Sequence, residues 1–274
     1  MPCDFVIKAD GSEQAFQKEK VIKTCLRVGV TAAEANQIAN KVEERCYDGI
    51  PTKEILEMLF DEYLKPYKPI IAFRNNLRKS ISLLRSKPDF EFFIQKLLEE
   101  IGYTVTPNCI CQGKCVEHEI DAVAKNNEDT ILVEIKHHKN EHTMTDLEVC
   151  RGMWAKFEDL QEGFQEGVHP FPFSKAMIIT NTKFSKHALK YSRCRNIDHI
   201  NWYELEKLIE ERKFYPITLL KGPNKKERDK LIDEKIITLR QLIESDAEQV
   251  AKKLNHKQEI IDDWISKSKE ILSD

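Results

Sequence analysis

Residues 119–136 read EIDAVAKNNEDTILVEIK, and this stretch decides the fold predicted for the middle of the chain. Two apolar runs, 118–124 and 130–135, enclose the polar segment 126–129, a pattern typical of two strands joined by a hairpin turn. Residues two apart on a strand point to the same side, so Glu134 and Lys136 share one face and Val133 and Ile135 share the other. The hairpin would bring Asp121 beside Glu134.

The flanking segments extend this hairpin into an α/β domain. An amphipathic helix is predicted over 90–101, and Gly102 ends it before a strand at 103–106. Further elements follow in the order helix 144–160, strand 176–180, helix 185–194 and strand 199–202. This order predicts an α/β sandwich around a mixed sheet.

The charged residues on these strands form the set that phosphodiester cleavage requires. Mg²⁺ prefers carboxylate oxygens, and a bound metal can polarise a phosphate and activate a water. A lysine can orient that water and offset the charge that develops on the phosphate. Asp121, Glu134 and Lys136 supply this set, and Glu91 in the preceding helix offers a fourth group. Glu and Lys residues two apart on a strand usually lie on a solvated face. Here they interrupt an apolar strand, and the hairpin follows an amphipathic helix, as a site of this kind requires.

The same residues resemble a known superfamily. Phe90-Glu91 through Gly102-Tyr103, then Glu119-Ile120-Asp121, then Val133-Glu134-Ile135-Lys136, is similar to the PD-(D/E)xK restriction-endonuclease-like nucleases, close to the Mrr-type branch. Segments 112–121 and 180–185 add to the resemblance. It implies a restriction-endonuclease-like mixed sheet flanked by helices. It also implies that Asp121, Glu134 and Glu91 hold Mg²⁺ or Mn²⁺, and that Lys136 is the catalytic lysine.

The N-terminal region has a different pattern, with a short strand at 5–8, a turn at Asp10-Gly11 and helices that include 18–28 and segments opened by Thr31 and Thr52. Residues 6–12, 20–21 and 47–50 resemble an ATP-cone, a mostly helical nucleotide-sensing module. The resemblance implies ATP or dATP as effector, with Lys8, Asp10, Gly11 and Lys20 as binding residues. Ala9 stands where the family usually has arginine. Alternatively, Asp10-Gly11 is simply a hairpin turn.

Residues 216–274 show only helical patterning, with short helices expected at 231–236, 239–243, 247–254 and 257–272. The basic run 221–230 is predicted to be a linker. Segments 236–242 and 246–254 resemble a helix-hairpin-helix-like module, which would hold DNA backbone. Because the usual hairpin glycine is absent, a packing or dimerisation element is the alternative. The predicted domains are therefore an ATP-cone (1–87), a nuclease domain (88–220) and a C-terminal helical module (221–274).

Some cysteines and histidines near the predicted hairpin have more than one interpretation. Cys109, Cys111, Cys115 and His118 allow a zinc set, but their spacing lacks the usual C-x2-C knuckle, and small strand or loop residues are the alternative. His138 is a candidate phosphate contact or a scaffold for the site.

Composition limits the function classes. The 274 residues are 41% hydrophobic and 32% charged, typical of a globular protein with real cores. A net charge of −3 argues against a protein that coats nucleic acid indiscriminately, although a local basic groove suffices for DNA binding. The apolar runs are too short for a membrane span, and the N-terminus does not resemble a signal peptide. We expect a cytoplasmic protein with free cysteines and no membrane partner.

The sequence therefore predicts a Mg²⁺-dependent DNA endonuclease that adenine nucleotide regulates and that acts as a homo-oligomer, a dimer in the simplest case. Two alternatives stay open. One is a nucleotide-responsive DNA-binding regulator that uses the nuclease fold as a platform, and the other is a structure-selective junction resolvase.

Overall fold

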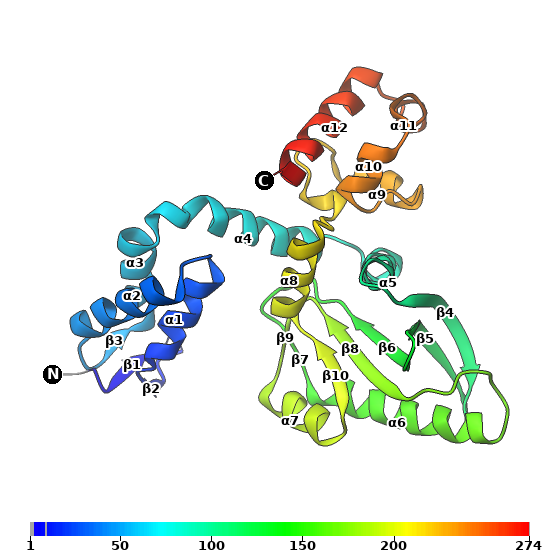
Figure 1. Cartoon of the computed structure of the whole chain (residues 1–274), viewed down its shortest axis with the longest axis horizontal. Helices are drawn as coiled ribbons and strands as arrows, with labels where there is room; N and C mark the ends of the chain where they lie inside the picture. The colour runs from blue at the N-terminus through cyan, green and yellow to red at the C-terminus, as the bar shows by residue number, and fades with distance from the viewer. Residues whose placement is uncertain (1–2, 9, 274) are drawn as a thin grey trace. The chain divides into compact units, whose positions relative to one another are not determined.

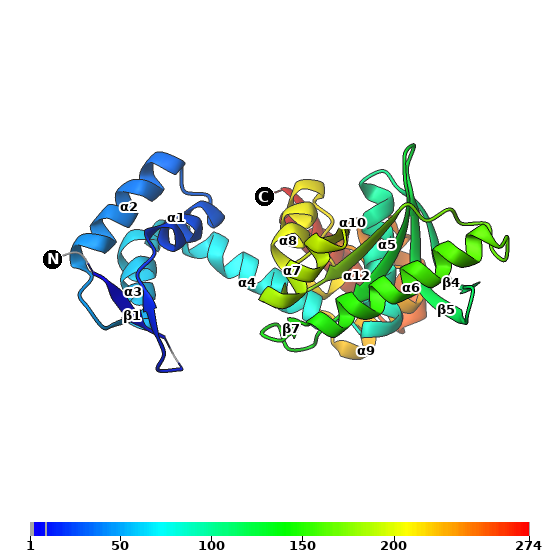
Figure 2. The ribbon, with the colours of Figure 1, turned by 90° about the horizontal axis from the view of Figure 1, so that it is seen from below.

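The computed structural model describes residues 3–8 and 10–273, and the chain divides into two compact units, Met1–Asn75 and Asn76–Asp274 (Figures 1 and 2). Ala9, where the N-terminal pattern departs from its family, lies outside the described residues. Within the described part, no helix is both long and apolar enough to cross a membrane.

The first unit pairs a small sheet with helices. Its elements are β1 (Phe5–Ile7), β2 (Glu13–Ala15), α1 (Lys18–Arg27), α2 (Ala32–Arg45), β3 (Ile50–Pro51), α3 (Thr52–Met58), a π-helical turn (Leu59–Tyr63), a 3-10 turn (Lys65–Tyr67) and the start of α4 (Lys68–Ser82). The sheet order is β2-β1-β3, with β2 antiparallel and β3 parallel to β1. The expected hairpin and helices are present, and β3 is an addition that the sequence did not predict.

Local chemistry explains why this unit forms. Thr31 caps α2 because its hydroxyl accepts the Glu34 N–H, as the sequence pattern predicted. Gly11 has φ +79°, a conformation that L side chains avoid, so glycine permits the turn between β1 and β2. The core lies where the apolar faces of the helices meet the sheet, and its fully buried members include Cys25, Ala35, Ala39, Val42, Ile50 and Leu64.

The second unit is built on a five-stranded mixed sheet in the order β10-β8-β6-β5-β4. Its strands are β4 (Thr104–Gln112), β5 (Glu117–Lys125), β6 (Thr130–Lys136), β8 (Lys175–Thr180) and β10 (Ile197–Ile200). β4, β5 and β6 are antiparallel, whereas β8 runs parallel to β6 and β10 parallel to β8. The predicted α/β sandwich around a mixed sheet is therefore confirmed.

Helices cover both faces of this sheet. A π-helical turn (Ser86–Phe90) leads into α5 (Glu91–Glu100), and α6 (Leu147–Gln165), α7 (Lys186–Cys194) and α8 (Trp202–Arg212) follow. α6 runs along one face and α5 lies over the other (Figures 1 and 2). Cys150, Met153, Phe157 and Leu160 of α6 pack against Val123 and Leu132 of the sheet.

Three details of this region differ from the prediction. The long helix begins at Leu147 rather than 144, because Asp146 caps it, and residues 144–145 instead form β7 (Met144–Thr145), which pairs with β9 (Lys183–Phe184). The last strand ends at Ile200, because Asn201 and Glu204 form a capping box that starts α8. β4 extends to Gln112, well beyond the predicted strand at 103–106.

The C-terminal residues form α9 (Lys225–Asp233), α10 (Leu239–Glu244), α11 (Ala247–Leu254) and α12 (Gln258–Ser273), after a 3-10 turn (Ile217–Leu219). The prediction of a linker at 221–230 is wrong. Asn224 accepts the Glu227 N–H and Glu227 accepts the Asn224 N–H, and this capping box starts α9 inside the basic run.

Several polar contacts join the C-terminal helices to the rest of the second unit. Arg85 pairs with the buried Asp89 at 2.7 Å and with Asp233 of α9 at 2.9 Å. Arg240 of α10 pairs with Glu100 of α5 at 2.8 Å. These helices therefore belong to the same packed unit as the sheet.

We predict that Gly163→Ala destabilises the second unit. A Cβ there would lie 2.9 Å from the Gly113 carbonyl carbon and 2.9 Å from the Lys114 nitrogen, and backbone cannot move aside cheaply. We expect a loss of about 1–3 kcal/mol in the free energy of unfolding. Urea unfolding followed by tryptophan fluorescence measures this change, because Trp154, Trp202 and Trp264 all lie in the second unit.

Gly152→Ala is the matched control on the same helix. Nothing lies within 4 Å of a Cβ at that position, so the substitution should be neutral or stabilise the helix by up to about 1 kcal/mol. Equal stability of the two variants would contradict the proposed close approach of the 113–114 backbone to α6.

Candidate active site

The predicted carboxylates lie where the ladder between β5 and β6 ends. Ala122 pairs with Val133, and Asp121 and Glu134 are the next residues outward. Asp121 is buried, and its Oδ2 accepts the Ile135 N–H at 2.8 Å. The side chain of Asp121 thus replaces a backbone partner at the point where the two strands separate. Glu134 is one-quarter exposed on the neighbouring strand.

Glu91 is connected to Asp121 through two amide side chains. Glu91 lies buried in the first turn of α5, and its Oε2 accepts from Asn108 Nδ2 at 2.8 Å. Gln95, one turn further along α5, donates from Nε2 to Asn108 Oδ1 at 2.6 Å and to the Asp121 carbonyl oxygen at 2.8 Å. These bonds fix the helix end against β4 and β5, so Glu91 and Asp121 are held in one network.

Lys87 faces three carboxylates of this network. Its Nζ lies 2.8 Å from Glu119 Oε1, 3.2 Å from Glu91 Oε1 and 3.6 Å from Asp121 Oδ1. The bond to Glu119, followed by that to Glu91, raises the pKa of Lys87 above its usual value, so the ammonium stays protonated. The same bond lowers the pKa of Glu119.

A second lysine holds Glu134. Lys156 of α6 donates from Nζ to Glu134 Oε2 at 2.7 Å and to the Glu119 carbonyl oxygen at 3.0 Å. Lys136 lies exposed at the end of β6, opposite Thr180 of β8, and forms no ion pair with any residue that the structure describes. Of the two lysines, therefore, Lys156 rather than Lys136 contacts the candidate metal ligand.

The electrostatics of the cluster favour a cation. Burial, then the charge of Glu134, raise the pKa of Asp121 to about 6, with Glu91 adding to the effect, although the Ile135 N–H and Lys87 act in the opposite direction. The carboxylates of this cluster therefore carry more negative charge than the Ile135 N–H and the two lysines, Lys87 and Lys156, neutralise. Carboxylate oxygens in such an arrangement are suitable ligands for Mg²⁺.

The side chains do not form a finished metal cage in this conformation. Across residues 3–8 and 10–273, no three His, Cys, Asp or Glu side chains are grouped closely enough to hold a metal ion. Two lysine ammonium groups instead contact the carboxylates that were predicted as ligands. The candidate ligands offer only carboxylate oxygens, and each is already paired with a lysine ammonium. Oxygen ligands of this kind fit a hard divalent ion.

The histidines and cysteines near the hairpin have structural contacts. Asp159 of α6 accepts from His118 Nε2 at 2.7 Å and from the Cys115 N–H at 2.8 Å. Burial alone would raise the pKa of Asp159, but the Cys115 N–H and His118 outweigh it and set the pKa at about 2. His138 is partly buried, bonds Thr145 Oγ1 through Nε2 at 3.1 Å, and has its pKa lowered by burial. His138 therefore has the contacts of a scaffold residue.

In the N-terminal unit, the predicted nucleotide-binding residues fall in two places. Lys8, Asp10 and Gly11 form the β1–β2 turn, in which Asp10 Oδ1 accepts from both the N–H and the hydroxyl of Ser12. Lys20 lines a cavity of about 260 Å³ between the strands, α1 and α3. Of the four predicted residues, only Lys20 lines the cavity, and the other three lie in the turn.

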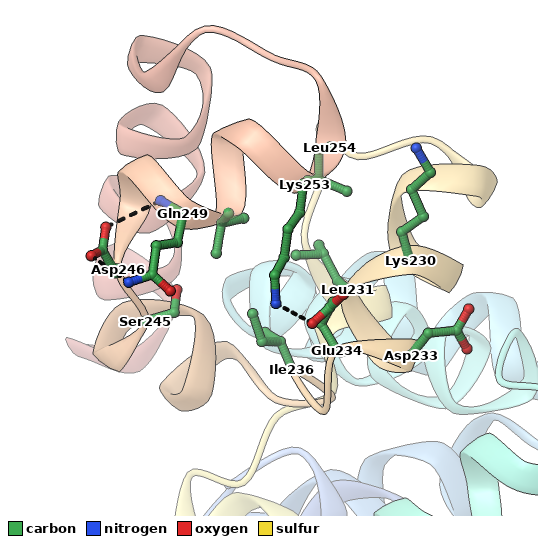
Figure 3. A pocket seen from close by; sticks show the side chains of 11 residues that line it. Lys230, Leu231, Asp233, Glu234, Ile236, Ser245, Asp246, Gln249, Lys253 and Leu254 are labelled. Atoms are coloured by element: carbon green, nitrogen blue, oxygen red, sulfur yellow. Dashed lines mark hydrogen bonds and ion pairs between the residues drawn. The ribbon is translucent and has the colours of Figure 1, made fainter.

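A larger pocket, of about 460 Å³, lies between α9 and α11 (Figure 3). Leu231, Ile236, Val250 and Leu254 line it together with charged side chains. Lys253 and Glu234 form an ion pair across it, and Gln249 bonds Asp246 at 3.1 Å. The pocket contains none of the predicted catalytic residues.

Sequence reasoning did not identify five residues of the catalytic region: Lys87, Gln95, Asn108, Glu119 and Lys156. One of them carried a usable signal, since Gln95 stands four residues after Glu91 on the same helix. Lys156 carried none, because its contact depends on how α6 crosses the sheet.

Comparison with known proteins places these features in families. Residues 85–210 match the family described as "Restriction endonuclease", of the Mrr catalytic type. Residues 4–80 match the family described as "ATP cone domain", and residues 215–272 match the one described as "AF1548-like, C-terminal". The predicted resemblances to an Mrr-type nuclease domain and an ATP-cone are therefore confirmed. The resemblance of the C-terminal helices to a helix-hairpin-helix stays a prediction.

Two individual proteins are similar over much of the chain. An uncharacterized protein of Archaeoglobus fulgidus is 34% identical over 160 residues, which cover 57% of this chain and 86% of that protein. The crystal structure titled "Protein of Unknown Function AF1548" superposes with a TM-score of 0.56 at 29% identity, covering 67% of this chain and 96% of that one. Neither title assigns an activity.

We predict that Asp121→Asn stabilises the second unit at alkaline pH. A carboxyl whose folded pKa is raised contributes most stability below its unfolded pKa, near 4, and loses it as the pH rises through about 6. Asparagine can still accept the Ile135 N–H but carries no charge. At pH 8 in EDTA we expect a gain of about 2–3 kcal/mol in unfolding free energy.

The gain should disappear below about pH 4, where Asp121 is protonated in both states. Urea unfolding at pH 3.5, 6 and 8, followed by tryptophan fluorescence, measures this dependence. A difference between variant and wild type that does not change with pH would show that charge at Asp121 is not the cause.

Proposed function

Since the chain belongs to the Mrr-type restriction-endonuclease-like family and carries an N-terminal ATP-cone, we propose that it is a Mg²⁺- or Mn²⁺-dependent DNA endonuclease regulated by adenine nucleotide. The observation that carries the proposal is the buried carboxylate of Asp121, which lies where the β5–β6 ladder ends, next to Glu134, and shares one hydrogen-bond network with Glu91. Burying the carboxylates of Glu91 and Asp121 beside a third, Glu134, destabilises a fold, and such groups concentrate at functional sites.

Asp121, Glu134 and Glu91 are the residues that would hold the metal. When bound, the ion would polarise the scissile phosphate and lower the pKa of a water. Asp121 is fixed by the Ile135 N–H, and Glu91 is fixed by Asn108, so two of the three ligands are held in place before any ion arrives. Fixed ligands lower the reorganisation needed at the moment of reaction.

Lys136 is proposed as the lysine that meets the substrate. Its ammonium is exposed and not engaged in an ion pair among the described residues, whereas Lys156 is bound to Glu134. A free ammonium on the same strand as Glu134 can approach a phosphate without breaking an existing bond. DNA, linear or branched, is the proposed substrate class. The intact set of Asp121, Glu134 and Lys136 favours cleavage over binding alone.

We predict that Asp121→Ala and Lys136→Ala each abolish cleavage, because both residues are proposed to act in the chemistry. Glu91→Ala should reduce cleavage less. The assay incubates plasmid, linear duplex and branched DNA with the protein in Mg²⁺ or EDTA, and EDTA should stop the reaction.

Glu128→Ala is the matched carboxylate control, since Glu128 is exposed in the β5–β6 turn, and it should cleave at the wild-type rate. Wild-type cleavage by folded Asp121→Ala would remove Asp121 from the mechanism. Cleavage restricted to branched DNA would favour a junction resolvase, and DNA binding without any cleavage would favour the regulator.

The ATP-cone is proposed to bind ATP or dATP. The cavity beside Lys20 combines an ammonium with the hydroxyls of Thr24 and Thr52 and with apolar side chains that suit a flat base. A lysine offers charge to a triphosphate. Ligand binding to one conformation of this unit can shift how protomers assemble. Two active sites are needed to cut both strands, and pairing of protomers is the simplest source of the second.

We predict that ATP or dATP changes the oligomeric state and that cleavage follows this change. A coupling of roughly 1–3 kcal/mol would alter activity by about 5- to 150-fold. Calorimetry and light scattering at millimolar nucleotide test it. Lys20→Ala should weaken binding, whereas Lys23→Ala, exposed on the same helix and outside the cavity, should not. Absence of both heat and mass change would exclude nucleotide control.

A further inference from the structure

Lys87 occupies a position that a metal ion would compete for. Its ammonium lies within 3.6 Å of oxygens from Glu91, Glu119 and Asp121. Glu91 and Asp121 are also proposed metal ligands. A magnesium ion binds carboxylate oxygens at about 2.0–2.1 Å. An ammonium and a divalent cation that share the same two carboxylates repel each other strongly at such distances.

The side chains of this cluster differ in how easily they can move. The Glu91 and Asp121 side chains are only 4% and 8% exposed, whereas the Lys87 side chain is 56% exposed. Asn108 and the Ile135 N–H hold the two buried carboxylates. Lysine has a flexible four-carbon stem and no fixed fork geometry. When the cluster rearranges, Lys87 is therefore the group that moves, and it can enter solvent without opening a cavity.

Glu119 gives the displaced lysine a place to go. It is 64% exposed, and its contact with Lys87 is the shortest of the three. Lys87 can keep this contact at the surface while giving up those to Glu91 and Asp121. The positive charge then stays at the rim of the site.

We propose that Lys87 is a positioning residue whose ammonium holds Glu91 and Asp121 together before the metal binds, and that a divalent cation displaces it toward Glu119. The inference rests on the proposed function, because it takes Glu91 and Asp121 as metal ligands. Lys87 sets the affinity for the ion, since every binding event must first remove one positive charge from the ligands.

Metal affinity tests the proposal without any cleavage. Mn²⁺ titration of the full chain by calorimetry compares wild type with Lys87→Met, which keeps the length of the side chain and removes its charge. We expect Lys87→Met to bind Mn²⁺ about tenfold more tightly. Lys87→Arg should bind about as wild type does, and Lys87→Met combined with Asp121→Asn should lose the gain.

Lys114→Met is the matched control. Lys114 also lies between two carboxylates, 3.1 Å from Glu162 and 3.7 Å from Glu166, and its side chain is 47% exposed. Its ion-pair partners are not candidate metal ligands, so its substitution should leave Mn²⁺ affinity unchanged. Unchanged or weaker Mn²⁺ binding by folded Lys87→Met overturns the proposal, because an ammonium that competes with the ion for Glu91 and Asp121 must weaken binding while it is present.

If Lys87→Met does not fold, a measurement on the wild-type protein tests whether the metal displaces Lys87. Limited acetylation by an amine-reactive ester, followed by peptide mass spectrometry, reports how accessible each lysine is. Mn²⁺ should increase acetylation of Lys87 several-fold relative to Lys114, and no increase overturns the proposal. Displacement of Lys87 by Mn²⁺ in a protein that cleaves no DNA would leave this inference standing and remove the nuclease proposal.

Discussion

The candidate site of the second unit is organised around one carboxylate, Asp121, which is buried within an apolar sheet. Asp121 can stay there because its oxygen accepts the Ile135 N–H where the β5–β6 ladder ends, and because Lys87 lies beside it. The surrounding network follows from this one requirement. Gln95 and Asn108 supply the amide groups that join β4 and β5 to the end of α5, and Lys156 neutralises the neighbouring Glu134. The candidate site is therefore built on the same strands, β5 and β6, that contribute Ile120, Val123 and Leu132 to the hydrophobic core.

The fold was predictable where periodicity is strong. Alternating apolar residues defined β5 and β6, and the spacing of Glu134 and Lys136 followed from the two-residue repeat of a strand. The prediction of secondary structure failed where a loop-like composition outweighed a helix N-cap signal. Residues 221–230 are basic and contain Gly222-Pro223, so they were assigned to a linker, yet Asn224 and Glu227 start α9 within them. The site was predictable only in part, because Lys156 and Glu119 reach it through tertiary packing, which no local pattern encodes.

The two units contain different kinds of site. In the first, a cavity among apolar side chains with one lysine suits a ligand that carries both a flat ring and charge. In the second, the groups are carboxylates and ammonium ions arranged around a strand end. The residues of α4 (Lys68–Ser82) belong in part to the first unit and in part to the second, so the chain passes from one kind of site to the other through this helix.

The contacts of Arg85 have a consequence for how the parts of this chain can be exchanged in evolution. Arg85 binds both the buried Asp89, two residues from Lys87, and Asp233 of α9. Deleting the C-terminal helices would remove Asp233 from Arg85 and Arg240 from Glu100 of α5. A recombination event that exchanged these helices for unrelated ones would therefore disturb the catalytic half of the molecule. The nuclease domain and the C-terminal helices are therefore expected to descend together as one evolutionary unit.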